Sequence, residues 1–121
     1  MSNAAQAYAR TSKTTGTARE IEAQALLKAA KQLRDIQSNW TGPSASMHKA
    51  LLFNRRLLTI FLSAVESSEN PQPLEVRQNI VNIAVFVMAR TIEMQTNPTP
   101  EKLQSLIDIN SNIAAGLSGR G

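Results

Sequence analysis

Residues 50–61 read ALLFNRRLLTIF, and nine of these twelve residues are apolar or threonine. Asn54, Arg55 and Arg56 stand in a row at the centre of the stretch. At about 100° per residue around a helix, Arg56 falls opposite the apolar arc, and Arg55 falls at its edge, where its stem can cover apolar surface. Asn54 falls inside the arc. The stretch is therefore predicted to be a helix that buries an asparagine.

Cap residues upstream predict where this helix and the one before it begin. Ser44 or Ser46 can cap the helix that contains residues 50–61, because serine oxygens accept hydrogen bonds from free amides of a first helical turn. Thr17 and Glu20 have the spacing of a capping box. The first two helices are therefore predicted at about 18–38 and 45–66.

The second half of the chain also contains residues that typically begin and end helices. Pro73 suits the first position of a third helix, and Thr99 followed by Pro100 suits the start of a fourth, which Gly116 should close. These two helices are predicted at about 73–95 and 100–115. Short connections between four helices predict an all-α fold, an antiparallel four-helix bundle. We expect one helical domain at 17–121, preceded by a flexible N-terminal segment at 1–16, which is mobile or forms a short helix.

The second and third predicted helices carry apolar arcs of roughly 200°, about twice the width that a core-facing helix needs. Either these two helices are the most buried pair, or part of the arcs forms a groove for another apolar helix. Arg77 lies within the third helix's arc, one turn from its start, where it can cap neighbouring carbonyls or contact a partner. Leu52 and Phe86 are apolar residues on polar faces and are weak interface candidates.

Asn110 lies in the middle of the fourth helix's apolar face, as Asn54 does in the second. Both are roughly ten residues from their helix starts, and the second and fourth helices of an up-down bundle run parallel. A buried amide without a hydrogen bond costs about 1–3 kcal/mol, so Asn54 and Asn110 are predicted to pair with each other, with water or with backbone. Two roles stay open, a structural polar core that fixes register and a contact with a partner.

Composition narrows the possible functions. The chain has no cysteine and a formal net charge of +4, and its single histidine, His48, is expected on the surface. No acidic cluster has metal spacing and no glycine-rich loop could hold phosphate, so we expect no metal, no cofactor and no enzyme activity. No apolar run is long enough for a bilayer, and no signal peptide is visible, so a cytoplasmic protein without a membrane segment is predicted. Without a Lys/Arg run, direct binding to nucleic acid is not expected.

Four segments in this order carry a family resemblance: REIEAQALLKAA (19–30), ALLFNRRLLTIFLSAV (50–65), VRQNIVNIAVFVMARTIEM (76–94) and LIDINSNIAAGL (106–117), with Tyr8 near the start. From about Ala4 to Leu117 the chain resembles the FlaF family of alphaproteobacterial flagellar biosynthesis regulators. The resemblance implies a cytoplasmic secretion chaperone that binds flagellin and promotes its synthesis and export. Such proteins act with or against FlbT, which restrains flagellin translation.

The resemblance supplies no active site, but its NRR and RQN matches identify surface candidates. Flagellin is the predicted partner and FlbT a second candidate. The candidate partner-binding residues are Leu52, Asn54, Arg55, Arg56, Arg77, Gln78, Asn79 and Phe86. The alternative is a translational regulator of flagellin messenger RNA, acting directly or through FlbT. RNA would bind the basic face of Lys28, Lys31 and Arg34, and that binding would weaken steeply with salt.

Overall fold

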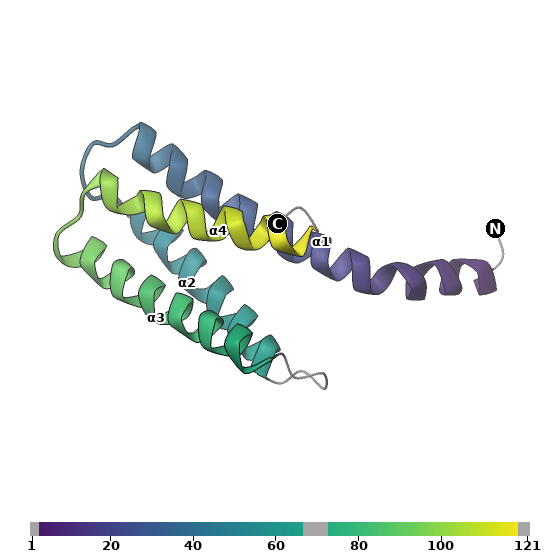
Figure 1. The fold of residues 1–121 in the computed structure, drawn as a ribbon. Coiled ribbons are helices and arrows are strands. Elements are labelled where there is room, and N and C mark those ends of the chain that lie inside the picture. Colours follow the sequence, from purple (N-terminus) through teal and green to yellow (C-terminus); the bar gives the residue numbers. More distant parts are fainter. Residues whose placement is uncertain (1–2, 67–72, 119–121) are drawn as a thin grey trace.

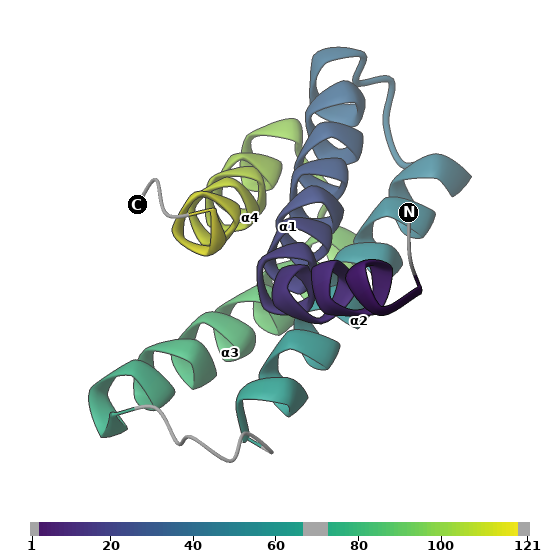
Figure 2. The same ribbon diagram turned by 90° about the vertical axis from the view of Figure 1, so that its right-hand side faces the viewer.

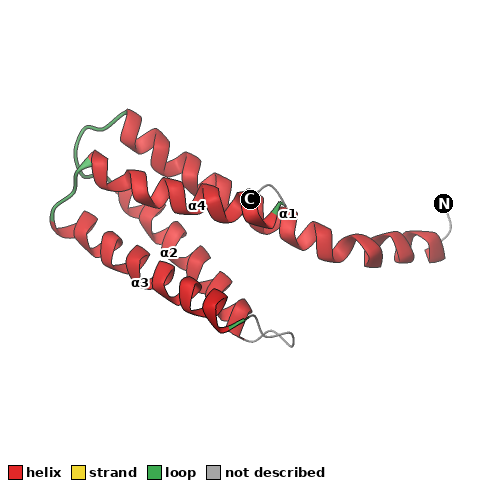
Figure 3. Ribbon diagram, viewed as in Figure 1, coloured by secondary structure: helices red, strands yellow, loops and turns green. Residues whose placement is uncertain are grey.

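The structure of this 121-residue protein is a computed structural model. It describes the backbone of residues 3–66 and 73–118, and the side chains of residues 18–64, 73–75 and 77–118. Helices account for nearly all of the described chain (Figure 3). They are α1 (Asn3–Ser38), α2 (Ala45–Glu66), α3 (Leu74–Thr96), a 3-10 turn η1 (Pro100–Lys102) and α4 (Leu103–Leu117). The prediction of an all-α fold with four packed helices is confirmed.

The start of α2 follows the predicted cap chemistry. The Met47 amide donates to the Ser44 hydroxyl at 3.1 Å, so Ser44 rather than Ser46 caps α2. Thr99 is at the N-cap position of η1, with Pro100 next to it, but its side chain makes no capping hydrogen bond. Pro73 differs slightly, since it precedes α3 as the N-cap residue. The predicted end of the second helix at about 66 is confirmed, since α2 ends at Glu66.

Two predicted boundaries are wrong. Gly116 lies inside α4, which continues to Leu117. The backbone of α1 begins at Asn3 rather than near residue 18, so Thr17 lies inside the helix and cannot be its N-cap. The physical reason is that residues 3–17 contain no proline and are rich in alanine near their start, so nothing in them forces a helix to end. The flexibility of residues 1–16 stays a prediction.

The four helices form an open bundle. α1 packs most closely against α4, α2 packs against both α1 and α3, and α3 has only a small contact with α4. Figures 1 and 2 show the hairpin of α2 and α3 diverging from α1 and α4 toward the last turns of α2 and the first turns of α3. The N-terminal part of α1 projects well beyond the other helices. We call the divergent side the open end and the opposite side the closed end.

The hydrophobic core extends from the closed end along α1 and α4. Its fully buried large side chains come from all four helices, namely Leu26, Leu33, Met47, Leu51, Val87, Met94, Leu103, Leu106 and Ile107. Burying a leucine completely stabilises a fold by about 1.5–3 kcal/mol. The connection before α4 is tied down by two side chains, since Gln37 Nε2 donates to the Pro100 carbonyl at 3.1 Å and Lys102 Nζ donates to the Asn97 carbonyl at 2.7 Å. The closed end therefore fixes the positions of the helices.

The suggestion that the second and third helices are the most buried pair is wrong. The closest packing joins α1 and α4. Among the described side chains of α3 only Val87, Thr91 and Met94 are buried. Because α3 lies at the outer corner of an open bundle, the core can cover only one of its sides. The alternative, an apolar arc that is partly free, is the arrangement that the structure shows.

Candidate partner-binding surface

Helix α3 is apolar on two sides. Its core side contains Val87, which is 1% exposed, and its other side contains Val85, which is 61% exposed. At 100° per residue the exposed apolar side lies roughly 140° around the helix from the core side. We call this exposed row the outer stripe, and it consists of Leu74, Val81, Val85, Met88 and Ile92. Nothing in the described part of the chain covers it.

An apolar cleft opens beside the same helix. It lies where α2, α3 and α4 diverge at the open end, and its volume is about 150 Å³. Every lining side chain is apolar. We call it the open-end cleft, and its lining residues are Leu58, Phe61 and Leu62 of α2, Ile80, Ile83 and Ala84 of α3, and Ile113 of α4.

The outer stripe and the open-end cleft are neighbours on α3. In helical phase Ala84 lies between Ile80, which lines the cleft, and Met88, which belongs to the stripe. The Ala84 side chain is a single methyl group, so it does not form a barrier between the cleft and the stripe. The cleft and the stripe therefore form one apolar surface that runs from the gap beside α4 to the solvent side of α3. Extended apolar patches on soluble proteins mark interaction sites.

Arg77 is a charged residue of α3 that borders this apolar surface. Its helical phase places it between the cleft side and the stripe, and its side chain is exposed. Among the described residues it makes no ion pair and caps no carbonyl, so the capping role predicted for it is not found. An exposed guanidinium beside apolar surface can bind a carboxylate with two parallel hydrogen bonds.

The other candidates from the NRR and RQN segments do not form one cluster. Arg55, Arg56, Gln78 and Asn79 are exposed, and their side chains make no hydrogen bond to one another in the described structure. Gln78 borders the outer stripe, whereas Arg56 points away from the buried side of α2, as its helical phase predicts. Leu52 is exposed on α2, as expected.

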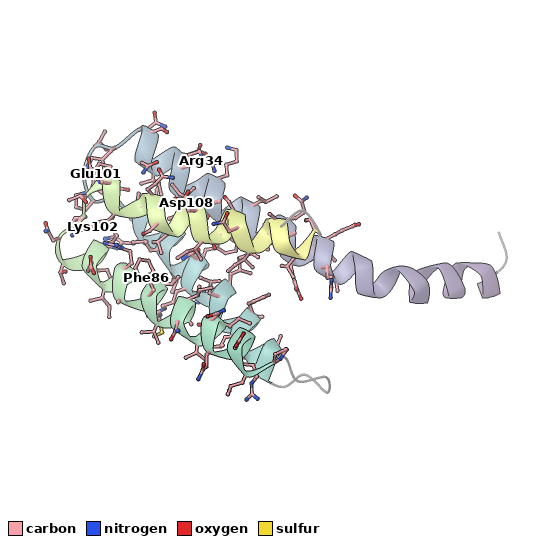
Figure 4. All side chains as sticks on the ribbon, viewed as in Figure 1. Arg34, Phe86, Glu101, Lys102 and Asp108 are labelled. Carbon is pink, nitrogen blue, oxygen red and sulfur yellow. The ribbon has the colours of Figure 1, made fainter. Side chains whose placement is uncertain are left out.

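Phe86 is exposed, as expected, but its ring contacts a neighbouring side chain. The Arg90 guanidinium lies 5.1 Å from its ring centre, and Arg90 Nη1 also pairs with Glu93 Oε2 at 2.9 Å. Figure 4 labels Phe86 on α3 and Arg34 on α1, at separate places on the molecule. Phe86 therefore belongs to a local surface cluster on α3 rather than to the outer stripe.

The predicted contact between Asn54 and Asn110 is confirmed. Both residues are 0% exposed, and Asn110 Nδ2 donates a hydrogen bond to Asn54 Oδ1. The other two amide atoms, Asn54 Nδ2 and Asn110 Oδ1, have no protein partner. Leu58 and Ile113, one helical turn further along α2 and α4, already line the open-end cleft. The asparagine pair thus lies between the closed-end core and the cleft.

The basic face on α1 is partly engaged. Lys31 Nζ pairs with Asp35 Oδ2 at 2.9 Å, and Lys28 Nζ lies 5.6 Å from the centre of the Phe53 ring. Lys31 could leave its ion pair at little cost, because exposed ion pairs contribute only about 0–1 kcal/mol. The face still offers fewer free cations than the sequence suggests.

The sequence reasoning missed the core side of α3. Thr91 is buried and its hydroxyl donates to the Val87 carbonyl at 2.7 Å, and Met94 is fully buried. The spacing of Val87, Thr91 and Met94, at i, i+4 and i+7, is the signal that could have separated this side from the outer stripe. A wide apolar arc hides that signal, because the stripe has the same spacing.

Two other kinds of functional feature are absent from the described residues. No helix among them is both long and apolar enough to cross a bilayer. No three histidine or acidic side chains in that part of the chain gather closely enough to hold a metal ion. The apolar surface on α2, α3 and α4 is therefore the principal candidate site.

Comparison with known proteins identifies the family. The model of the flagellar protein FlaF family matches residues 4–117, which include almost all of α1 and the whole of the other helices. A search of curated proteins and a search of solved structures each found no match. The family match confirms the resemblance carried by the four sequence segments, and the chain belongs to the FlaF family of flagellar proteins.

Proposed function

We propose that this flagellar protein is a cytoplasmic secretion chaperone that binds flagellin, promotes its synthesis and export, and acts with or against FlbT. The observation that supports this function most directly is the exposed apolar surface of the outer stripe and the open-end cleft. An amphipathic helix binds a protein by placing its apolar side in such a groove. The terminal segments of flagellin are apolar and helix-forming, and stay unfolded until assembly, so they have the properties of such a ligand.

Two opposing free-energy terms act in this binding mode. A disordered segment that folds on binding loses conformational entropy, which costs about 2–5 kcal/mol or more. Covering apolar side chains offsets this cost by about 25 cal/mol per Å² of apolar area removed from water. The apolar area that the segment covers therefore decides how tightly it binds and how readily it is released for export.

A calorimetric titration of flagellin N-terminal and C-terminal segments into the folded full-length chain tests the proposal. We expect a saturable heat from one of the segments. Val85→Glu should abolish this heat, because it places a charge in the centre of the outer stripe. Leu27→Glu is the matched control, since Leu27 is an exposed apolar residue on α1, and it should leave binding unchanged. Folded protein that gives no heat with either segment would contradict the function.

The salt dependence of the affinity distinguishes the messenger RNA alternative from binding of flagellin through the apolar surface. Binding through Lys28, Lys31 and Arg34 would displace counterions from RNA, so its affinity would fall steeply as salt rises. Binding through the apolar surface should change little over the same range. We therefore expect the flagellin affinity to change little with salt and flagellin messenger RNA to give no saturable binding. RNA binding that weakens steeply with salt would favour the alternative. A separate titration of FlbT in the same assay shows whether FlbT binds the chain directly.

A further inference from the structure

We propose that the open-end cleft is an anchor pocket that takes one bulky aliphatic or aromatic side chain from an amphipathic helix lying along the outer stripe. A carboxylate on the same helix would then meet Arg77. This inference rests on the proposed function, because it specifies how a flagellin segment would bind. It specifies a pocket, the kind of side chain that fills this pocket and a carboxylate close to that side chain on the same helix.

The size and chemistry of the cleft select the anchor. Its volume of about 150 Å³ is close to that of an apolar cavity that holds benzene, so a leucine, methionine or phenylalanine side chain fits it. All seven lining residues are apolar, which leaves a polar side chain without hydrogen-bond partners among them. The pocket therefore discriminates by shape and apolarity.

The pocket is available because the bundle does not close over it. Phe61, Leu62, Ile80, Ile83 and Ile113 around the cleft are only half-buried. The hydrogen bond from Asn110 to Asn54 joins α4 to α2 one turn away. Because α4 packs mainly against α1, it stays at the edge of the cleft, where Ile113 lines it.

Charge and position identify the occupant. Arg77 is exposed, forms no ion pair with a described residue, and lies between the cleft side and the stripe. Glu75, the acidic residue nearest to it in sequence on α3, falls roughly 160° around the helix from it and cannot neutralise it across the stripe. A helix that places a carboxylate beside its apolar anchor complements this arrangement. A second copy of the chain would need to bring its own carboxylate to the same position.

Benzene tests the pocket without flagellin. In the full-length chain carrying labelled isoleucine methyl groups, we expect benzene to shift the Ile80, Ile83 and Ile113 signals saturably. Ala84→Leu places a larger side chain at the edge of the cleft and should abolish these shifts. Ala45→Leu, the same change at an exposed position at the start of α2, should leave them intact. Unshifted isoleucine signals in the folded wild-type chain would overturn the pocket.

Flagellin segments test the occupant. Ala84→Leu should weaken binding of the segment at least tenfold, and Ala45→Leu should not. Arg77→Glu should weaken it severalfold, whereas Lys49→Glu, an equal change of charge on α2, should have little effect. Replacing the segment's anchor residue by alanine should make the Ala84→Leu substitution nearly silent, because both changes remove the same contact.

The possible results separate the inference from the function it rests on. If flagellin binds wild type and Ala84→Leu equally, the anchor pocket is overturned while the chaperone function stands. If benzene shifts the three isoleucines but no flagellin segment binds, the pocket is supported and flagellin is overturned as its occupant. If sedimentation shows a dimer that Ala84→Leu dissociates, the occupant is a second copy, and the inference of a foreign helix is wrong.

Discussion

Asn54 and Arg56 are two positions apart, yet the first is fully buried and the second is exposed. Helical phase alone predicts this difference, because two residues advance the side chain by about 200°. The same reasoning places Asn54 opposite Asn110 and predicts their contact. It cannot predict which amide atoms stay unpaired, since that depends on the relative rotation of α2 and α4. The burial of each asparagine therefore follows from the phase of its own helix, whereas the geometry of the pair depends on how the helices pack.

The asparagine pair makes a specific stability prediction. Asn54→Leu or Asn110→Leu alone should destabilise the fold by about 1–3 kcal/mol, because each leaves the other amide buried without its partner. The double substitution should cost less than the sum of the two, since no amide then lacks a partner. Urea unfolding followed by circular dichroism measures the three free energies.

An exposed amide provides the control for this double-mutant cycle. Asn112 lies on the solvent side of α4, and Asn112→Leu should change stability by less than about 0.5 kcal/mol. Additive effects of the Asn54 and Asn110 substitutions would mean that the hydrogen bond between them contributes nothing. Amide spectra of the double variant show whether the pair also keeps the native state unique.

At the scale of elements, α3 shows how far an apolar pattern can be interpreted. The 200° arc correctly predicts that α3 has more apolar surface than one core contact needs. It does not show which part is covered, because the core side and the outer stripe repeat with the same spacing. Cap chemistry has a similar limit. Ser44 caps α2, whereas Thr17 and Glu20 have the capping-box spacing but lie within a continuous α1.

Two valines in α3 test this division. Val87→Ala should destabilise the fold by about 1.5–2.5 kcal/mol, because it removes buried methyl groups and leaves a small cavity. Val85→Ala is the matched substitution on the outer stripe and should cost less than about 0.5 kcal/mol, since Val85 is mostly exposed in the free chain. Chemical unfolding of both variants measures the difference. Equal losses would show that the stripe is covered in solution.

In the whole molecule, the core and the candidate binding surface are largely separate. Core residues of all four helices are almost completely excluded from water. The apolar side chains around the cleft are mostly half-buried, and those of the outer stripe are exposed along α3 as far as Ile92. A partner can therefore contact the cleft and the stripe without disturbing the core.

The projecting part of α1 provides a test at this scale. Deleting residues 1–16 should leave the free energy of unfolding within about 0.5 kcal/mol of wild type, because this part of the helix extends beyond the other three (Figure 1). Deleting residues 1–26 is the contrasting truncation. It removes the buried Ala23 and Leu26 and should cost at least about 2–5 kcal/mol. A large loss from the shorter deletion would show that the projecting helix packs against the bundle.

The sequence alone is sufficient to predict the all-α class, the helix at 45–66, the capping serine region before it and the burial of Asn54 and Asn110. Each of these depends on chemistry within one or two helical turns or on the phase of a single helix. Only the tertiary structure decided that α1 pairs most closely with α4, that one side of α3 stays in solvent, and that a cleft opens beside α4. The physical reason is that helix packing depends on how whole surfaces fit together, whereas helix formation depends on neighbours along the chain.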